Sequence, residues 1–359
     1  MPHFIYKTMS ESLPTGSITG KIKTRLIMVI VAGAVALLLM VLASLALGTV
    51  NYSFHTVVST LIDVFKNGVT TGIERTIYNL RFPRVLAAFG VGAGLAVAGT
   101  AFQAIVRNPL VDPYMTGVSS GAGLGATLYM VFFSTVAMVS YLAMPLFAFA
   151  FAVLAFFCTL TISKISGNSN VSFVLAGVII AMGFGAVTTI IMLTNEQYAH
   201  GILGFLYGSF SSISWNTAAM ITVPVIIVSS IFILYSRTFN VILLGREQSM
   251  ELGVNYDRFR IAAMLAASFL SAICVAFVGI IGFVGLIVPH LARMIFGGDH
   301  RLIFITSMII GALLLSSADI LVKEIINVAG ITVPIGAITT LIGVPFFVFI
   351  LKKRGKGYA

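Results

Sequence analysis

Long apolar runs, separated by short polar stretches, dominate the chain. Ten runs stand out, at residues 26–47, 84–106, 114–136, 141–163, 171–193, 216–235, 260–281, 282–296, 302–322 and 334–351. A helix needs about 20 apolar residues to cross the hydrocarbon core of a bilayer. Inside that core the backbone must satisfy its own hydrogen bonds, which favours helices. The pattern therefore predicts an all-α membrane protein with about ten transmembrane helices.

The polar stretches predict a simple domain organisation. We expect a cytoplasmic tail at 1–25, a single transmembrane domain at 26–353 and a second cytoplasmic tail at 354–359. The first run is longer than the apolar core of a signal peptide, which is about 7–15 residues, so we expect a retained span. The boundary near Gly282 is open, because the glycine-rich segment there could hold a re-entrant turn.

Composition and charge support this class and suggest an orientation. Hydrophobic residues make up 59% of the chain, charged residues only 9%, and the mean hydropathy is +1.08. A formal net charge of +10 would suggest nucleic acid in a soluble protein. With the N-terminus inside, however, sixteen of the 21 Lys and Arg residues fall on the cytoplasmic side, as the positive-inside rule requires. We expect a multi-pass protein of the cell membrane, with both termini cytoplasmic and no nucleic-acid partner.

Motifs of soluble enzymes are either absent or out of context. The segment 117–121 matches the G-x-S-x-G nucleophile elbow at Ser119, but that elbow needs a preceding strand. Here the serine opens an apolar run, where a hydroxyl suits a helix N-cap. No Walker A phosphate loop occurs, and the five histidines lack ligand spacing. We therefore expect no catalytic residue, no metal site and no cofactor in this chain.

Small residues and two polar segments distinguish this chain from a simple anchor. Gly90 and Gly94, like Gly121 and Gly125, are four residues apart, a spacing that lets helices approach closely. An outer segment at 81–84 holds two arginines around Pro83. The longest cytoplasmic loop, at about 237–259, predicts a short helix that stops at Gly253 and suits contact with a soluble partner.

These two segments resemble one family when taken with further motifs along the chain. The others are Arg107–Pro113, the G-F-V-G-L-I-V-P-H-L-A-R segment at 282–293, G-D-H-R at 298–301, Ala318-Asp319, and the P-I-G and G-V-P-F-F elements between 334 and 347. In order and spacing they resemble the permease subunit of ABC importers for iron-siderophores, haem and cobalamin. The likeness covers about residues 81–353.

The resemblance implies a complete transport assembly. The expected unit is a homodimer with ten helices per subunit and a translocation path at the twofold axis. Two cytoplasmic ATPase subunits would bind ATP and Mg, and an extracytoplasmic solute-binding protein would deliver the substrate. ATP hydrolysis is expected in the partner, in agreement with the missing phosphate loop.

The resemblance also assigns roles to residues. The ATPase-coupling positions are Leu244, Gly245, Ser249, Leu252 and Gly253, with Ser249 where the family has alanine. The positions that dock the binding protein are Arg81, Arg84 and Lys323. We also expect Gly183 and Gly185 to line the translocation path.

Two alternatives remain open at this point. An ion-driven secondary transporter usually keeps carboxylates near the middle of the membrane, and only Asp319 and Glu324 come close, both near an outer end. An intramembrane hydrolase would depend on Ser119 alone. Transport with an inactive ATPase partner distinguishes the importer from the ion-driven transporter.

Overall fold

The computed structural model describes residues 15–134 and 142–355, and this part of the chain is a helical bundle without strands. Its first half contains α1 (Thr15–Ala46), α2 (Phe54–Asn67), α3 (Gly72–Glu74), η1 (Arg75–Arg81), α4 (Phe82–Val106), η2 (Pro113–Thr116), α5 (Val118–Leu128), η3 (Tyr129–Phe133), α6 (Ala143–Ile165) and α7 (Asn170–Thr194). The second half contains α8 (Glu196–Leu206), α9 (Trp215–Leu234), α10 (Ser236–Ile242), α11 (Arg246–Glu251), α12 (Tyr256–Val278), α13 (Val284–Phe296), α14 (His300–Ala329) and α15 (Ile335–Gly355).

Each of the ten predicted apolar runs coincides with a helix. Seven helices are long and apolar enough to cross a membrane: Thr24–Ala46, Gly72–Val106, Ala143–Ile165, Asn170–Thr194, Trp215–Leu234, Tyr256–Val278 and His300–Ala329. Three shorter apolar helices, Val118–Phe133, Val284–Phe296 and Ile335–Val348, occupy the remaining runs. The prediction of an all-helical membrane protein is confirmed. The tail residues 1–14 and 356–359 lie outside the described residues.

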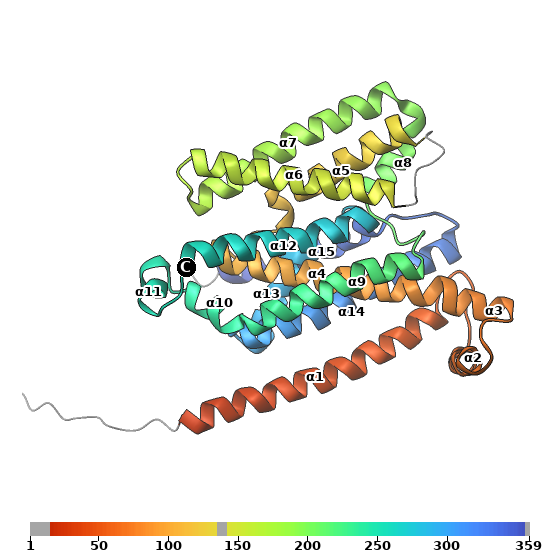
Figure 1. Ribbon diagram of the computed structural model, residues 1–359. Coiled ribbons are helices and arrows are strands. Elements are labelled where there is room, and N and C mark those ends of the chain that lie inside the picture. Colours follow the sequence, from red (N-terminus) through yellow and green to blue (C-terminus); the bar gives the residue numbers. More distant parts are fainter. Residues whose placement is uncertain (1–14, 135–141, 356–359) are drawn as a thin grey trace, which may run out of the picture.

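Short helices that hydropathy did not reveal lie at the two ends of the bundle. Figure 1 shows α2 and α3 at one end, and α10 and α11 at the opposite end. The helix α2 begins where the Ser53 side chain accepts a hydrogen bond from the Thr56 N–H. An N-cap of this kind replaces a missing helical hydrogen bond and fixes the start of a helix. These elements are too short to span and too polar to register as apolar runs.

The helix α4 forms the centre of the bundle, with α9, α12, α13 and α14 packed around it (Figure 1). Almost all of its residues are buried. Its contact with α14 is close because glycines face each other: a Cβ added to Gly92 would come within 2.2 Å of the Gly311 carbonyl oxygen. Small residues allow such backbone approach in membranes, where dispersion contacts drive helix association.

The pairing of α5 with α6 follows the predicted glycine spacing. A Cβ on Gly121 or Gly125 would come within 2.3 Å of the carbonyl oxygens of Phe151 and Phe147, respectively. The same face of α5 therefore meets the backbone of α6 one turn apart. The predicted close approach at this pair of glycines is confirmed.

The glycine-rich segment at 279–283 interrupts the helices α12 and α13. Gly279 and Phe283 have positive φ angles of 77° and 69°. The backbone pairs instead with a neighbouring loop: the Ile280 N–H donates to the Phe205 carbonyl over 3.2 Å, and the Ser209 N–H donates to the Val278 carbonyl over 2.8 Å. The open boundary is thus a non-helical joint between two helices. Non-helical backbone at membrane depth is tolerated where protein supplies its hydrogen bonds.

Candidate functional site

The first candidate site is the segment that links α10, α11 and α12 at one end of the bundle. Two glycines with φ angles of 114° and 81°, Gly245 and Gly253, bracket α11. Past its end, the Val254 N–H donates to the Ser249 carbonyl over 2.9 Å, and the Gly253 N–H donates to the Met250 carbonyl over 3.0 Å. Glycine takes this left-handed conformation without steric cost. The predicted short helix that stops at Gly253 is confirmed.

Ser249 fixes the position of α11 against α10. Its side chain is fully buried, and its hydroxyl donates to the Val241 carbonyl over 3.0 Å and also contacts the Gly245 carbonyl. Both acceptors lie outside α11 itself. Because Ser249 faces inward, the opposite side of α11 is exposed on the surface.

The outward face of α11 is mixed: its exposed residues include charged side chains, and three exposed apolar side chains lie on it or directly beside it. Leu244, Met250 and Leu252 are 54%, 57% and 60% exposed. An ion pair between Arg246 Nη2 and Asp257 Oδ2, 2.8 Å long, lies beside them on the surface. Exposed apolar side chains grouped on a rigid element are typical of protein interaction sites. Of the predicted coupling residues, the structure thus gives Ser249 and the two glycines a positioning role and exposes the two leucines.

The second candidate site is a charge cluster toward the opposite end of α4 and α14. Asp319 is almost fully buried and accepts from two cations: Arg84 Nη2 lies 2.7 Å from Oδ1, and Lys323 Nζ lies 3.0 Å from Oδ2. Arg84 Nε also donates to both carboxylate oxygens. Lys323 further donates to the Ser44 hydroxyl of α1 over 3.1 Å. The cluster therefore ties α1, α4 and α14 together.

Arg81 lies close in sequence to this cluster but serves a different contact. Its Nη1 donates to the Leu45 carbonyl over 2.7 Å, and its Nη2 donates to the Val50 carbonyl over 2.5 Å. Its guanidinium also lies 4.8 Å from the centre of the Tyr52 ring. The last carbonyls of a helix lack intrahelical donors. Arg81 supplies donors at the end of α1.

The placement of the three predicted docking residues differs from the expectation of an outer surface. Arg81 and Lys323 are buried, at 7% and 5% exposure, and Arg84 retains 20% exposure of its side chain. Sequence reasoning did not identify Asp319 as the acceptor for Arg84 and Lys323, although Lys323 follows it by one helical turn. Docking by these residues stays a prediction.

A cavity of about 720 Å³ lies beside the charge cluster. Its lining includes Arg84, His200 and Tyr207, and the methionines Met130 and Met144. Its lining also includes the loop after α8, around 208–213, and the loop before α15, at 332–334. The two loops are joined beside it, where the Gly336 N–H donates to the Tyr207 carbonyl over 2.9 Å. Two non-helical segments from distant parts of the chain therefore meet at this cavity. Their meeting cannot be read from any one of the segments.

The two glycines expected to line the path lie on α7, at the edge of the bundle (Figure 1). An added Cβ at Gly183 or Gly185 would meet nothing within 4 Å. Their neighbours Ile179 and Met182 are 59% and 71% exposed. An apolar face of this kind contacts either lipid or another protein chain. The assignment of these glycines to a path stays a prediction.

Ser119 does not lie in a nucleophile elbow. The segment before α5 is a short 3-10 helix, not a strand, and the N-cap of α5 is Gly117 with a φ angle of 83°. The expectation that Ser119 caps this helix is wrong, since the left-handed glycine takes that place.

Within the described residues, no group of three or more His, Cys, Asp and Glu side chains is arranged to hold a metal ion.

Comparisons with known proteins agree with these features over nearly the whole chain. Residues 36–353 match the model of the FecCD transport family. The chain is 34% identical to the cobalamin import system permease BtuC of Halobacterium salinarum, over 80% of this chain and 76% of that protein. It is 32% identical to the hemin transport system permease HmuU of Yersinia pestis, over 93% of this chain and 98% of that protein.

A solved structure also superimposes on the fold. It is described as an inward-facing conformation of a metal-chelate type ABC transporter, and the TM-score is 0.76 at 29% sequence identity. The match covers 90% of this chain and 98% of the solved one. The bundle thus shares its fold with a known ABC transporter.

Proposed function

The chain belongs to the FecCD transport family, and we propose that it is the membrane permease of an ATP-driven importer for iron(III)-siderophore, haem or cobalamin-type metal chelates. The family match over residues 36–353 carries this proposal. The relatives named for cobalamin and hemin transport support a chelate as substrate.

The segment that links α10, α11 and α12, called the coupling segment from here on, supports a separate subunit as the source of energy. We propose that two copies of this chain form a homodimer, and that each receives one ATPase subunit on α11. Leu244 and Leu252 would enter the partner, while Gly245, Ser249 and Gly253 hold them in position. ATP and Mg would bind to the ATPases, because this chain contains no Walker A sequence. A movement of α11 would then change which side of the dimer is open.

The charge cluster supports a binding protein on the other side. We propose that Arg84, which lines the cavity of about 720 Å³, offers its exposed edge to acidic residues of that protein. Arg81 and Lys323 would act with it only if docking exposes them, since both are buried. Lysine also lacks the bidentate fork with which arginine binds carboxylates.

Charge asymmetry supports the orientation. Sixteen of the 21 Lys and Arg residues lie on the side that carries α11 when the N-terminus is placed inside. We propose a protein of the cell membrane with both termini in the cytoplasm. The exposed apolar face of α7, with Gly183 and Gly185, would then face the second copy and the path between the two.

The charge cluster argues against Asp319 as the coupling group of an ion-driven transporter, which leaves that alternative with Glu324, whose Oε1 is buried without a hydrogen-bond partner within the described chain. A coupling ion or proton needs an available carboxylate, whereas Asp319 is already held by Arg84 and Lys323. Uptake by proteoliposomes with the cognate binding protein and ATPase tests the proposal. A Walker B substitution that blocks hydrolysis should abolish uptake of the chelate. Uptake that continues with the inactive ATPase and responds to an ion gradient would contradict it.

A further inference from the structure

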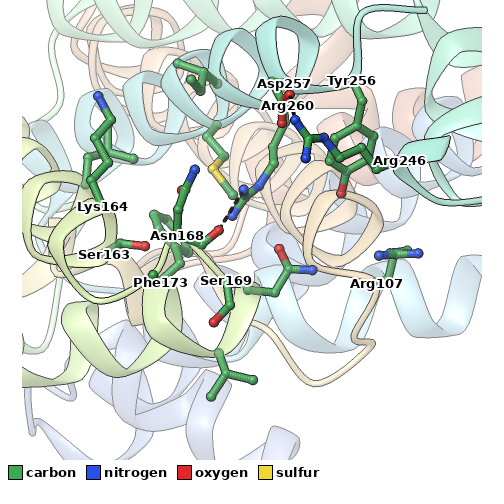
Figure 2. A pocket seen from close by; sticks show the side chains of 16 residues that line it. Arg107, Ser163, Lys164, Asn168, Ser169, Phe173, Arg246, Tyr256, Asp257 and Arg260 are labelled. Atoms are coloured by element: carbon green, nitrogen blue, oxygen red, sulfur yellow. Dashed lines mark hydrogen bonds and ion pairs between the residues drawn. The ribbon is translucent and has the colours of Figure 1, made fainter. Parts of the chain in front are cut away.

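A basic pocket of about 500 Å³ lies beside the coupling segment (Figure 2). It is formed where α6 ends and where α7 and α12 begin. All three helices are long and apolar enough to span the membrane. The pocket therefore lies at the level where the membrane meets water, on the side that carries α11.

The lining of this pocket is strongly cationic. Four cations, Arg107, Lys164, Arg246 and Arg260, line it together with one carboxylate, Asp257. That carboxylate is already paired with Arg246 over 2.8 Å. The other three cations thus surround a space with no second carboxylate in its lining. Such an arrangement favours an anion.

Arg260 is the central group of this pocket. The residue is only 8% exposed, and its Nη1 donates to the Asn168 carbonyl over 3.3 Å. Its Nε is buried and has no hydrogen-bond partner within the described chain. A buried guanidinium donor without an acceptor is costly. Figure 2 shows the Arg260 side chain pointing from α12 toward Asn168 among the other residues that line the pocket.

The backbone around the pocket is held in unusual conformations. Arg107 and Asn168 have φ angles of 56° and 53°, and they are two of the three non-glycine residues with positive φ among those described. Asn170 secures the turn by donating from Nδ2 to the Val106 carbonyl over 3.0 Å. Non-glycine residues in this region of φ and ψ cluster at functional sites, where surrounding contacts hold them.

The rim of the pocket indicates which anion fits. Ile165, Val171 and Ile261 are 82%, 68% and 42% exposed, and the last two line the pocket itself. An apolar rim would not stabilise a free anion, whereas the acyl chains of a lipid can pack against it. Basic pockets between transmembrane helices on the cytoplasmic side bind anionic lipid headgroups.

We propose that this pocket binds the phosphate group of an anionic membrane lipid. The phosphate oxygens accept from the guanidinium of Arg260 and from the exposed ends of Lys164 and Arg107, and the acyl chains lie along Ile165 and Val171. Because Arg246 belongs to α11, the headgroup connects the coupling segment to the turn between α6 and α7. This inference uses the proposed orientation but not the transported substrate, so it can fail while the proposed function holds.

Lipid binding to the full-length protein in detergent tests the proposal. Native mass spectrometry would measure bound phosphatidylglycerol, with phosphatidylcholine as the zwitterionic comparison. We expect a clear preference for phosphatidylglycerol, and about fivefold weaker binding for each cation removed in Lys164→Gln or Arg260→Gln. Lys164 is exposed, so its variant remains informative if the buried Arg260→Gln fails to fold.

Arg258→Gln is the matched control, since Arg258 lies on the same turn of α12 but lines a different cavity. Equal loss in Arg258→Gln, or no preference over phosphatidylcholine, would overturn the proposal. Glycerol phosphate distinguishes the sources of the phosphate: binding as strong as that of the lipid would replace the lipid by a free anion. Unchanged lipid binding with loss of ATPase co-purification in Lys164→Gln would assign the pocket to a protein carboxylate instead.

Discussion

Arg84 and Asp319 lie 235 residues apart in the sequence, yet Arg84 Nη2 and Asp319 Oδ1 are 2.7 Å apart in the structure. The contact joins the start of α4 to α14, and Lys323 completes it from one turn further along α14. One buried carboxylate thus pairs with two cations at this end of the bundle. Arg84 nevertheless keeps 20% exposure of its side chain and lines the cavity of about 720 Å³.

Removal of the shared carboxylate should destabilise the protein. In Asp319→Asn, Arg84 and Lys323 lose the negative charge that they share and one of the two acceptor oxygens, while Lys323 stays buried. Removing one partner of a buried ion pair typically costs about 3–5 kcal/mol, because the remaining charge is uncompensated. Denaturation in mixed micelles measures the free energy of unfolding. The control is Asp257→Asn, which breaks the exposed ion pair with Arg246 and should cost less than about 1 kcal/mol. Equal costs for the two variants would contradict the role of Asp319.

The guanidinium of Arg81 should be needed for its shape as well as its charge. Arg81→Lys keeps the charge but cannot reach the Leu45 and Val50 carbonyls together. We expect a loss of about 1–3 kcal/mol in unfolding free energy, the typical effect of leaving buried polar groups unsatisfied. Arg75→Lys, at an exposed position just before, should leave stability unchanged. If Arg81 acts only through docking, Arg81→Lys would lower affinity for the binding protein without affecting stability.

Variants of the coupling segment should distinguish the residue that positions α11 from the residues that contact the ATPase. Ser249→Ala removes the hydroxyl that donates to the Val241 and Gly245 carbonyls but keeps the buried contact, so uptake should fall only in part. Ser249→Trp cannot fit the fully buried site and should abolish uptake. Leu252→Asp, at a 60% exposed position, should release the ATPase while leaving thermal stability unchanged. Co-purification of the ATPase and ATP-dependent uptake are the measurements. Full coupling in Leu252→Asp would remove this face of α11 from the interface.

Asp299 should stabilise the start of α14 at neutral pH. Burial opposes ionisation, but hydrogen bonds from Arg301 and Asn240 outweigh it and lower the pKa of Asp299 to about 2. A lowered pKa means that the stabilisation is complete above the ordinary value of 3.8 and is lost as the pH falls toward 2. Asp299→Asn should therefore lower the melting temperature equally at pH 7 and pH 5, with a smaller difference below about pH 4. A difference that disappears already between pH 7 and pH 5 would contradict this assignment.

The sequence predicted the membrane helices well, because length and apolarity alone decide them. Gly253 was also predictable, since a glycine after a short polar helix is a common stop. The sequence left the boundary near Gly282 open, and the form of the joint at 279–283 was not predictable because its hydrogen bonds go to distant residues, Phe205 and Tyr114. The burial of Arg81 was hidden for a similar reason: its acceptors are carbonyls at the end of α1, about 35 residues earlier. Contacts of this kind depend on how helices pack and not on local pattern.

The central claim is that this chain supplies the membrane path while separate subunits supply energy and substrate. Uptake of a ferric siderophore, haem or cobalamin into proteoliposomes tests it most directly, with the purified chain alone compared with the chain plus its ATPase, binding protein and ATP. The account predicts no ATP turnover and no accumulation by the chain alone, and accumulation only by the complete assembly. ATP hydrolysis or concentrative uptake by the purified chain alone would contradict it.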